Sequence, residues 1–107
     1  MFFTRTPSIS PSEARERQHR GDLVLVDVRE PAETAAARIP GARTIPLGQL
    51  GGRLGELDTG KPVAFVCRSG ARSGQATKAA AKAGLDAVNV SGGLMAWSRE
   101  GLPVKRG

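Results

Sequence analysis

Residues 62–74, PVAFVCRSGARSG, decide the fold. The first six of these residues are a short and almost continuous apolar run, which is typical of a strand buried on both faces of a parallel sheet. A glycine-containing loop over residues 68–72 comes next, and an alanine-rich helix follows until Gly84 ends it. Small side chains at helical spacing are expected to form the buried face of this helix: Ala76, Ala79, Ala80 and Ala83.

The residues before this stretch predict two helices and another buried strand. Residues 10–13, SPSE, have the pattern of a capping box and start a helix that runs to about Arg20. Residues 23–27, LVLVD, are a second short apolar run and predict a second buried strand. Another helix begins near Pro31 and ends before the turn signal at residues 39–42.

Weaker signals fill the middle and the end of the chain. Residues 44–46 predict a very short strand, residues 87–90 a last strand, and residues 93–100 a last helix. Between them, leucines recur at helical spacing, but the glycines that separate them weaken this helix. These leucines are Leu47, Leu50, Leu54 and Leu57.

The alternation of strands and helices predicts an α/β fold with a mostly parallel sheet and right-handed crossovers. The length of 107 residues fits one domain, so we expect a single domain over residues 1–107. In sheets of this kind, ligands bind beyond the carboxyl ends of the strands. Asp27 and Cys67 both stand at such ends, which is where we expect the chemistry.

Composition limits the compartment and the partners. No apolar run is long enough to span a membrane, the opening MFFTR turns polar too early for a signal peptide, and one cysteine cannot form an internal disulfide. We therefore expect a cytoplasmic protein without a membrane partner. The net charge is +6, but aromatic residues make up only 4% and the basic residues are scattered, so we expect no nucleic acid. The charge either attracts small anions or serves only to keep the protein in solution. The only histidine, His19, is expected to be solvated, and neither a metal nor a cofactor is expected.

Cys67 is the candidate nucleophile. In a loop between a strand and a helix, successive backbone N–H groups can converge on one point, and the helix start adds a positive partial charge. Arg68 and Arg72 add full charges nearby, so the pKa of the Cys67 thiol is expected to lie below its usual value. The alternative is a buried structural cysteine that acts as a small hydrophobic residue.

The segment CRSGARS, residues 67–73, preceded by VAFV and followed by the alanine-rich helix, resembles the active-site loop of rhodanese-type sulfurtransferases. Other segments resemble the family in the same order, so that the resemblance extends over nearly the whole chain. They are LVLVDVREPAE (23–33), RIPGARTIPL (38–47), VSGGLMAW (90–97) and GLPV (101–104). The resemblance implies three layers, with a central five-stranded sheet flanked by helices.

The resemblance also assigns roles to residues. Cys67 corresponds to the nucleophile, and the loop around it corresponds to the residues whose amides surround a persulfide: Arg68, Ser69, Gly70, Ala71, Arg72 and Ser73. Arg72 corresponds to the arginine that closes the loop, and its planar fork suits the oxygens of a sulfonate. Asp27 and Arg29 correspond to a pair near the site, which we expect to be a structural ion pair. Arg38 stands where the family often has histidine, a departure that casts little doubt on sulfur transfer.

The implied reaction takes the outer sulfur of thiosulfate, or of another persulfide donor, onto Cys67 and passes it to an acceptor. Cyanide, a small thiol or a thioredoxin-like protein would serve as acceptor. The oligomeric state stays open.

Two other functions stay open at this point. Cysteine phosphatases also use a cysteine in an amide-lined loop closed by an arginine, but with five residues between the two, whereas four separate Cys67 from Arg72. A tetrahedral phosphate needs a wider cradle than a single sulfur atom, so a phosphatase is disfavoured. A non-catalytic interaction module of the same fold is the other alternative. The presence of both the cysteine and the loop arginine argues against it.

Overall fold

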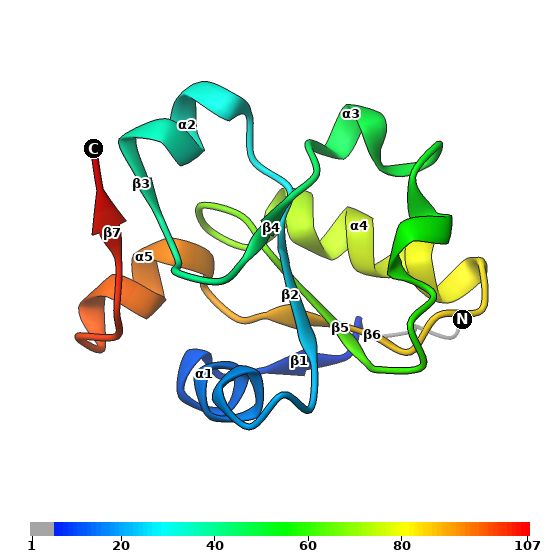
Figure 1. Ribbon diagram of the computed structural model, residues 1–107, viewed down its shortest axis with the longest axis horizontal. Coiled ribbons are helices and arrows are strands. Elements are labelled where there is room, and N and C mark those ends of the chain that lie inside the picture. The colour runs from blue at the N-terminus through cyan, green and yellow to red at the C-terminus, as the bar shows by residue number, and fades with distance from the viewer. Residues whose placement is uncertain (1–5) are drawn as a thin grey trace, which may run out of the picture.

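A computed structural model describes residues 6–107, and the opening MFFTR, interpreted above as no signal peptide, lies outside the described residues. The centre is a parallel five-stranded sheet in the order β1-β6-β5-β2-β4 (Figure 1). Its strands are β1 (Ser8–Ile9), β2 (Val24–Asp27), β4 (Arg43–Thr44), β5 (Val63–Val66) and β6 (Ala87–Val90). The predicted α/β fold and its five-stranded parallel sheet are confirmed.

Helices cover both faces of this sheet and complete three layers. They are α1 (Pro11–His19), α2 (Pro31–Ala36), α3 (Leu47–Leu50), the 3-10 turn η1 (Leu54–Leu57), α4 (Ala71–Lys82) and α5 (Gly93–Arg99). In Figure 1, α1 and α5 lie at the bottom and lower left, and α3 and α4 lie at the upper right. Within residues 6–107, no helix combines the length and the apolar character that a membrane crossing requires.

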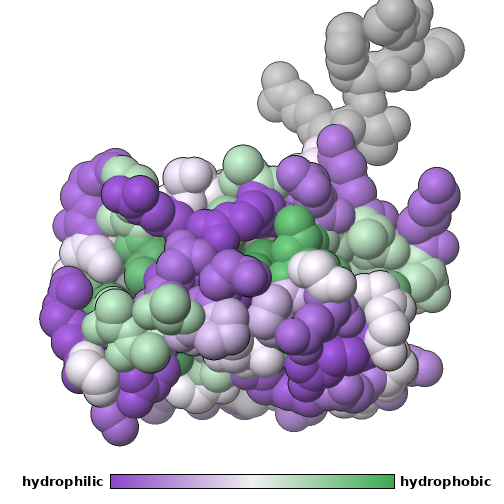
Figure 2. All heavy atoms as spheres, turned by 90° about the horizontal axis from the view of Figure 1, so that it is seen from above, coloured by the Kyte–Doolittle hydropathy of each residue, from purple (hydrophilic) through white to green (hydrophobic). Residues whose placement is uncertain are grey.

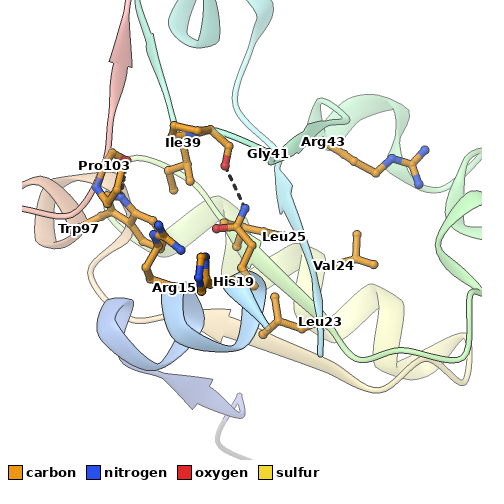
Figure 3. A pocket seen from close by; sticks show the side chains of 12 residues that line it. Arg15, His19, Leu23, Val24, Leu25, Ile39, Gly41, Arg43, Trp97 and Pro103 are labelled. Carbon is orange, nitrogen blue, oxygen red and sulfur yellow. Dashed lines mark hydrogen bonds between the residues drawn. The ribbon is translucent and has the colours of Figure 1, made fainter. Parts of the chain in front are cut away.

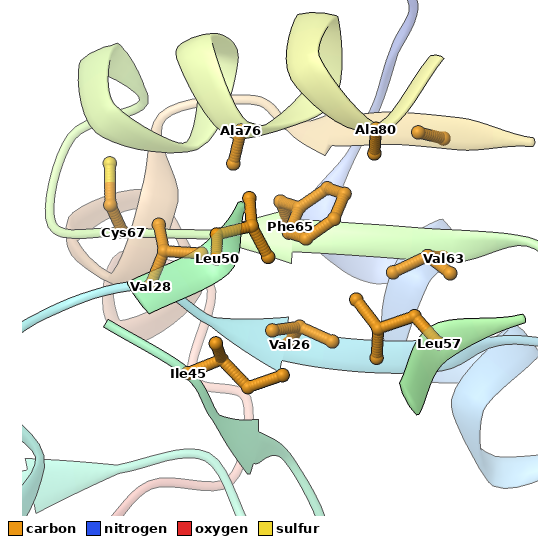
Figure 4. Packing of buried hydrophobic residues seen from close by; sticks show 11 residues of the cluster. Val26, Val28, Ile45, Leu50, Leu57, Val63, Phe65, Cys67, Ala76 and Ala80 are labelled. Carbon is orange, nitrogen blue, oxygen red and sulfur yellow. The ribbon is translucent and has the colours of Figure 1, made fainter. Parts of the chain in front are cut away.

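Two apolar clusters, one on each face, hold the layers together. On one face, Val26 and Phe65 of the sheet pack against Ala76 and Ala80 of α4 (Figure 4). On the other face, strand residues pack against α1 and α5, with fully buried Trp97 among them. The indole N–H of Trp97 also donates to the carbonyl of Pro103 at 2.8 Å.

The buried face of α4 differs from the predicted one. Ala76 and Ala80 are buried, but Ala79 and Ala83 are exposed. Ser73 and Thr77 complete the buried stripe instead. These four residues follow one another at three- and four-residue steps, which is the helical spacing of one face. Because alanines occur around most of this helix, their positions alone could not identify the face against the sheet.

Very short strands account for the other differences. The strands β3 (Ala37–Arg38) and β7 (Lys105–Arg106) form a separate antiparallel ribbon that the sequence did not predict. The edge strand β1 was also missed, since two residues carry no readable alternation. The leucine-rich segment is broken into α3 and η1, in agreement with the weakening expected from its glycines.

Candidate active site

Cys67 directly follows β5, the middle strand of the sheet. Its side chain stands at the carboxyl end of that strand, with the sulfur on the side of the sheet that α4 covers (Figure 4). The residue is only 1% exposed. Cys67 therefore lies at the edge where α/β sheets bind ligands, within a closely packed surrounding.

Hydrogen-bond donors surround the sulfur of Cys67. The amide N–H of Gly70 donates to Sγ at 3.0 Å, and the hydroxyl of Ser73 donates to Sγ at 3.2 Å. The backbone amides of Ser69 and Ser73 also favour the thiolate. Thr77 Oγ1 donates to the backbone carbonyl of Ser73 at 2.7 Å, in the first turns of α4. The loop thus forms a small cradle of donors around one atom.

These donors shift the pKa of the Cys67 thiol. Burial raises this pKa, because a charged sulfur loses hydration. The hydroxyl of Ser73 and the amides of Ser73, Gly70 and Ser69 act in the opposite direction, and the pKa lies below its ordinary value. The direction agrees with the sequence prediction. Among the contributions that lower the pKa, however, the leading ones are these hydrogen bonds and not the charges of Arg68 and Arg72.

The N-terminal end of α5 packs against the 67–73 loop and donates hydrogen bonds to it. Gly92 and Gly93 have φ angles of 72° and 58°, in the left-handed region. The following amides donate back to the loop, from Leu94 N–H to the carbonyl of Cys67 at 2.8 Å and from Met95 N–H to that of Arg68 at 3.0 Å. A side chain at Gly93 would collide with the same two carbonyls. The two glycines form a tight turn near the site, and close approach explains the second glycine.

Arg72 is bound by Glu33, which comes from the first turn of α2. Its Nη1 lies 2.7 Å from Oε1 of Glu33, and its Nη2 lies 2.9 Å from Oε2. This two-pronged contact is the leading cause that lowers the pKa of Glu33 from 4.5 to about 2. The fork expected to face a sulfonate is therefore occupied by a carboxylate. This ion pair connects the start of α4 to α2 and so holds the C-terminal end of the 67–73 loop in place.

Asp27 and Arg29 form a buried ion pair, with Nη2 of Arg29 at 2.8 Å from Oδ2 of Asp27. The two residues are 1% and 4% exposed. The backbone N–H of Arg29 also donates to Oδ1 of Asp27 at 2.9 Å, and its Nη2 donates to the carbonyl of Ala37 at 2.7 Å. These contacts fix the turn that leads from β2 into α2, as expected for a structural pair.

A pocket of about 450 Å³ lies beside the loop. Its walls come from α2, α5 and the loop, and include Arg29, Glu33, Arg68, Leu94 and Met95. Arg68 is exposed there, and Met95, 47% exposed, is the one exposed large hydrophobic side chain among residues 6–107. Figure 2 shows hydrophilic residues interspersed with smaller hydrophobic areas on the face seen from above. The pocket therefore offers one exposed arginine, Arg68, and a modest apolar wall.

A larger pocket of about 590 Å³ lies elsewhere, between α1 and residues 39–43 (Figure 3). No residue of the 67–73 loop lines it. Arg38 lies outside the loop as well, in β3, opposite Lys105 of β7. Among residues 6–107, no group of three or more His, Cys, Asp or Glu side chains is placed to hold a metal ion.

Two residues of the site were missed by the sequence analysis. Glu33 falls within the helix predicted to begin near Pro31, but no sequence pattern links it to Arg72, which is 39 residues away. Asn89 lies in β6, and its amide donates to the carbonyl of Gly70. An asparagine inside the apolar run AVNV is the signal that could have singled it out.

Comparison with known proteins gives the same family as the sequence resemblance. Residues 10–100 match the family model described as the rhodanese-like domain. A sulfurtransferase of Allochromatium vinosum is 43% identical over 84 residues, which are 78% of this chain and 78% of that protein. The putative sulfurtransferase YtwF of Bacillus subtilis is 43% identical over 82 residues, 77% of this chain and 80% of its own.

Solved structures agree with the fold. The crystal structure of a rhodanese-related protein from Thermoplasma volcanium superimposes with a TM-score of 0.85 at 32% identity, covering 92% of this chain and 97% of that one. A thiosulfate sulfurtransferase from Pseudomonas aeruginosa gives a TM-score of 0.86 at 26% identity, covering 95% of this chain but 20% of that one.

Proposed function

Because this chain belongs to the rhodanese-like domain family, we propose that it is a sulfurtransferase that carries sulfur as a persulfide on Cys67. The observation that supports this proposal most directly is the cradle of donors around one sulfur atom. Gly70 and Ser73 donate to Sγ at 3.0 and 3.2 Å, and they favour the thiolate that attacks in sulfur chemistry.

The first half of the reaction loads the cysteine. The thiolate of Cys67 attacks the outer sulfur of thiosulfate, a new S–S bond forms, and the S–S bond of thiosulfate breaks. Sulfite leaves with the electron pair of that bond. A persulfide donor reacts in the same way and releases a thiolate. We assign the sulfonate of thiosulfate to Arg68, which is exposed at the adjoining pocket, because the fork of Arg72 is held by Glu33.

The second half unloads the cysteine. Cyanide or the thiolate of an acceptor attacks the outer sulfur of the persulfide, and Cys67 leaves as a thiolate. The amides of the loop and the hydroxyl of Ser73 stabilise negative charge on sulfur in both halves. Asp27 and Arg29 support the site by fixing the turn beside it. A small thiol or a thioredoxin-like protein in a reducing cytoplasm would serve as the acceptor.

Thiocyanate formation from thiosulfate and cyanide tests the proposal. The unmodified protein should show double-displacement kinetics. Double-reciprocal plots of the rate against one substrate, recorded at several concentrations of the other, should give parallel lines. Cys67→Ser should remove the activity, while Gln75→Ala, an exposed position on α4, should retain it. Thiocyanate formation by Cys67→Ser, or hydrolysis of an aryl phosphate without sulfur transfer, would contradict the proposal.

A further inference from the structure

Asn89 is a polar side chain on the largely apolar face of the sheet that α4 covers. It lies in β6, where it pairs with Phe65 of β5 in parallel register. Paired residues of neighbouring strands point to the same face of a sheet, so Asn89 faces α4 together with Phe65. The buried side chains on this face are mostly apolar, including Ala76 of α4, and the exceptions are Ser73 and Thr77 of the same helix. A carboxamide is costly in such surroundings unless its hydrogen bonds are satisfied.

Only the N–H side of the Asn89 carboxamide has a hydrogen-bond partner. Nδ2 of Asn89 donates to the carbonyl oxygen of Gly70 at 3.3 Å, while Oδ1 is buried without a hydrogen-bond partner in the described part of the chain. Turning the amide over would place Oδ1 against the carbonyl oxygen of Gly70, where two acceptors repel. The contact with Gly70 therefore fixes the orientation of the amide.

Gly70 connects this amide to the reactive sulfur. Its N–H donates to Sγ of Cys67 at 3.0 Å, and its carbonyl accepts from Asn89 and, at 2.9 Å, from the amide of Gly74. Its φ of 115° is open to glycine and strained for other residues. Since only φ and ψ of Gly70 separate its N–H from its carbonyl, holding the carbonyl limits where the N–H can point.

We propose that Asn89 is a positioning residue, which aims the Gly70 N–H at the sulfur of Cys67 by holding the Gly70 carbonyl from the sheet. The inference rests on the proposed persulfide chemistry of Cys67, because the aimed N–H serves the thiolate and the persulfide. Gly70 has no side chain that could anchor it, and Gly74 leaves the same space open, since a Cβ at either glycine would lie 3.8 Å from Nδ2 of Asn89.

The unpaired Oδ1 supports a role in function over a role in stability. A buried acceptor without a partner destabilises the fold, and an apolar residue of similar volume would avoid this cost. A leucine at position 89 would suit the layer formed by Phe65 and Ala76. Asn89 is therefore expected to lower stability while it orders the loop, the trade-off typical of functional sites.

The test replaces Asn89 with leucine and measures the thiol pKa from the pH dependence of Cys67 alkylation by iodoacetamide. Asn89→Leu should raise the thiol pKa and lower the rate of thiocyanate formation about tenfold, the effect of ~1.4 kcal/mol in transition-state stabilisation. Its melting temperature should equal or exceed that of the unmodified protein. An unchanged thiol pKa together with an unchanged rate would overturn the proposal.

Gln18→Leu is the matched control. Gln18 also donates its side-chain amide to a backbone carbonyl, that of Pro40 at 3.0 Å, drawn as the dashed line beside Gly41 in Figure 3. It lines the larger pocket, away from the loop. Gln18→Leu should leave the thiol pKa and the rate unchanged. A rise in thiol pKa as large as that of Asn89→Leu would attribute the effect to lost amide contacts in general and overturn the assignment to Asn89.

A measurement on the unmodified protein covers the case in which Asn89→Leu does not fold. The side-chain amide signals of Asn89 in a ¹H–¹⁵N spectrum should shift with the same pH midpoint as Cys67 alkylation, while those of Gln18 stay still. Asn89 signals that ignore this titration would contradict the proposal. Both readouts need only the thiol, so they remain informative if the protein fails to transfer sulfur and the proposed function is wrong.

Discussion

At the scale of single residues, Ser73 makes the side-chain contact that favours the Cys67 thiolate most strongly. Its hydroxyl is fully buried and lies 3.2 Å from Sγ. The lowered pKa means that the thiolate contributes stability above the thiol pKa of the unfolded chain, and that this contribution is lost as pH falls through the folded pKa. The same hydrogen bond therefore favours reactivity and folding at alkaline pH, where the thiolate is the populated form.

Removing this hydroxyl gives a direct prediction. Ser73→Ala should raise the thiol pKa, so that the alkylation rate of Cys67 rises at a higher pH than in the unmodified protein. Sulfur transfer at neutral pH should fall about tenfold, the value of a ~1.4 kcal/mol loss, because a hydrogen bond to a charged group contributes roughly this much. Ser12→Ala, which removes an exposed hydroxyl bound to Glu100, should change neither property. An unchanged alkylation profile in Ser73→Ala would show that the hydroxyl does not act on the sulfur.

Glu33 gives a prediction about pH and stability. Its pKa is about 2 in the folded protein, so the Arg72 pair stabilises the fold above the ordinary pKa of 4.5 and is lost as pH falls toward 2. Because both side chains are about one third exposed, at 32% and 35%, screening limits the effect to about 1 kcal/mol.

Urea unfolding of Glu33→Gln checks this. The glutamine keeps an acceptor for the Glu30 N–H, which Glu33 binds at 3.0 Å, but removes the charge. The loss of unfolding free energy should be larger at pH 7 than at pH 3. Glu16→Gln, in an exposed pair with Arg20, serves as the control and should have little effect at either pH. A difference that grows toward pH 3 would contradict the sign of the argument.

At the scale of elements, the site depends on how closely α5 approaches the loop after β5. Gly93 lies against the carbonyls of Cys67 and Arg68 with a φ of 58°, while Gly101 has a similar φ of 75° and open space around it. The two glycines separate backbone strain, which both share, from close approach, which only Gly93 has.

Alanine at each position tests this separation. Gly101→Ala should lose about 1 kcal/mol of unfolding free energy, the usual cost of a left-handed backbone for alanine, and keep its sulfur transfer. Gly93→Ala should lose more, because the loop or α5 must move, and its sulfur transfer should fall in the fraction that remains folded. Equal losses of stability and full activity in both variants would show that the approach of α5 does not order the loop.

The elements also show where sequence reasoning succeeds. Nearly continuous apolar runs such as residues 23–27 and 62–67 predicted β2 and β5, and with them the position of Cys67 at a strand end. Strands of two residues, such as β1 and β3, leave no pattern to read. The predicted buried face of α4 was correct at only two of its four positions, because alanine is small enough to be buried or exposed at similar cost.

At the scale of the whole molecule, the folded arrangement adds contacts that no local pattern contains. The pairs Glu33–Arg72 and Asn89–Gly70 join residues 39 and 19 positions apart. Both act on the loop from outside, one from α2 and one from β6. The nucleophile and its loop could be predicted from the segment 67–73, whereas the residues that hold the loop depend on the crossovers of the sheet.

The central claim is that Cys67 carries the transferred sulfur. Since Cys67 is the only cysteine, its persulfide cannot be resolved by a second thiol of the same chain. The adduct should therefore accumulate until an external acceptor arrives.

Intact-mass measurement after thiosulfate treatment tests this claim most directly. We expect the mass to rise by one sulfur atom, to return to its starting value after cyanide or a small thiol is added, and to stay unchanged throughout in Cys67→Ser. A folded protein that gains no sulfur from thiosulfate or from a small persulfide, or one that gains it in Cys67→Ser, would contradict the account.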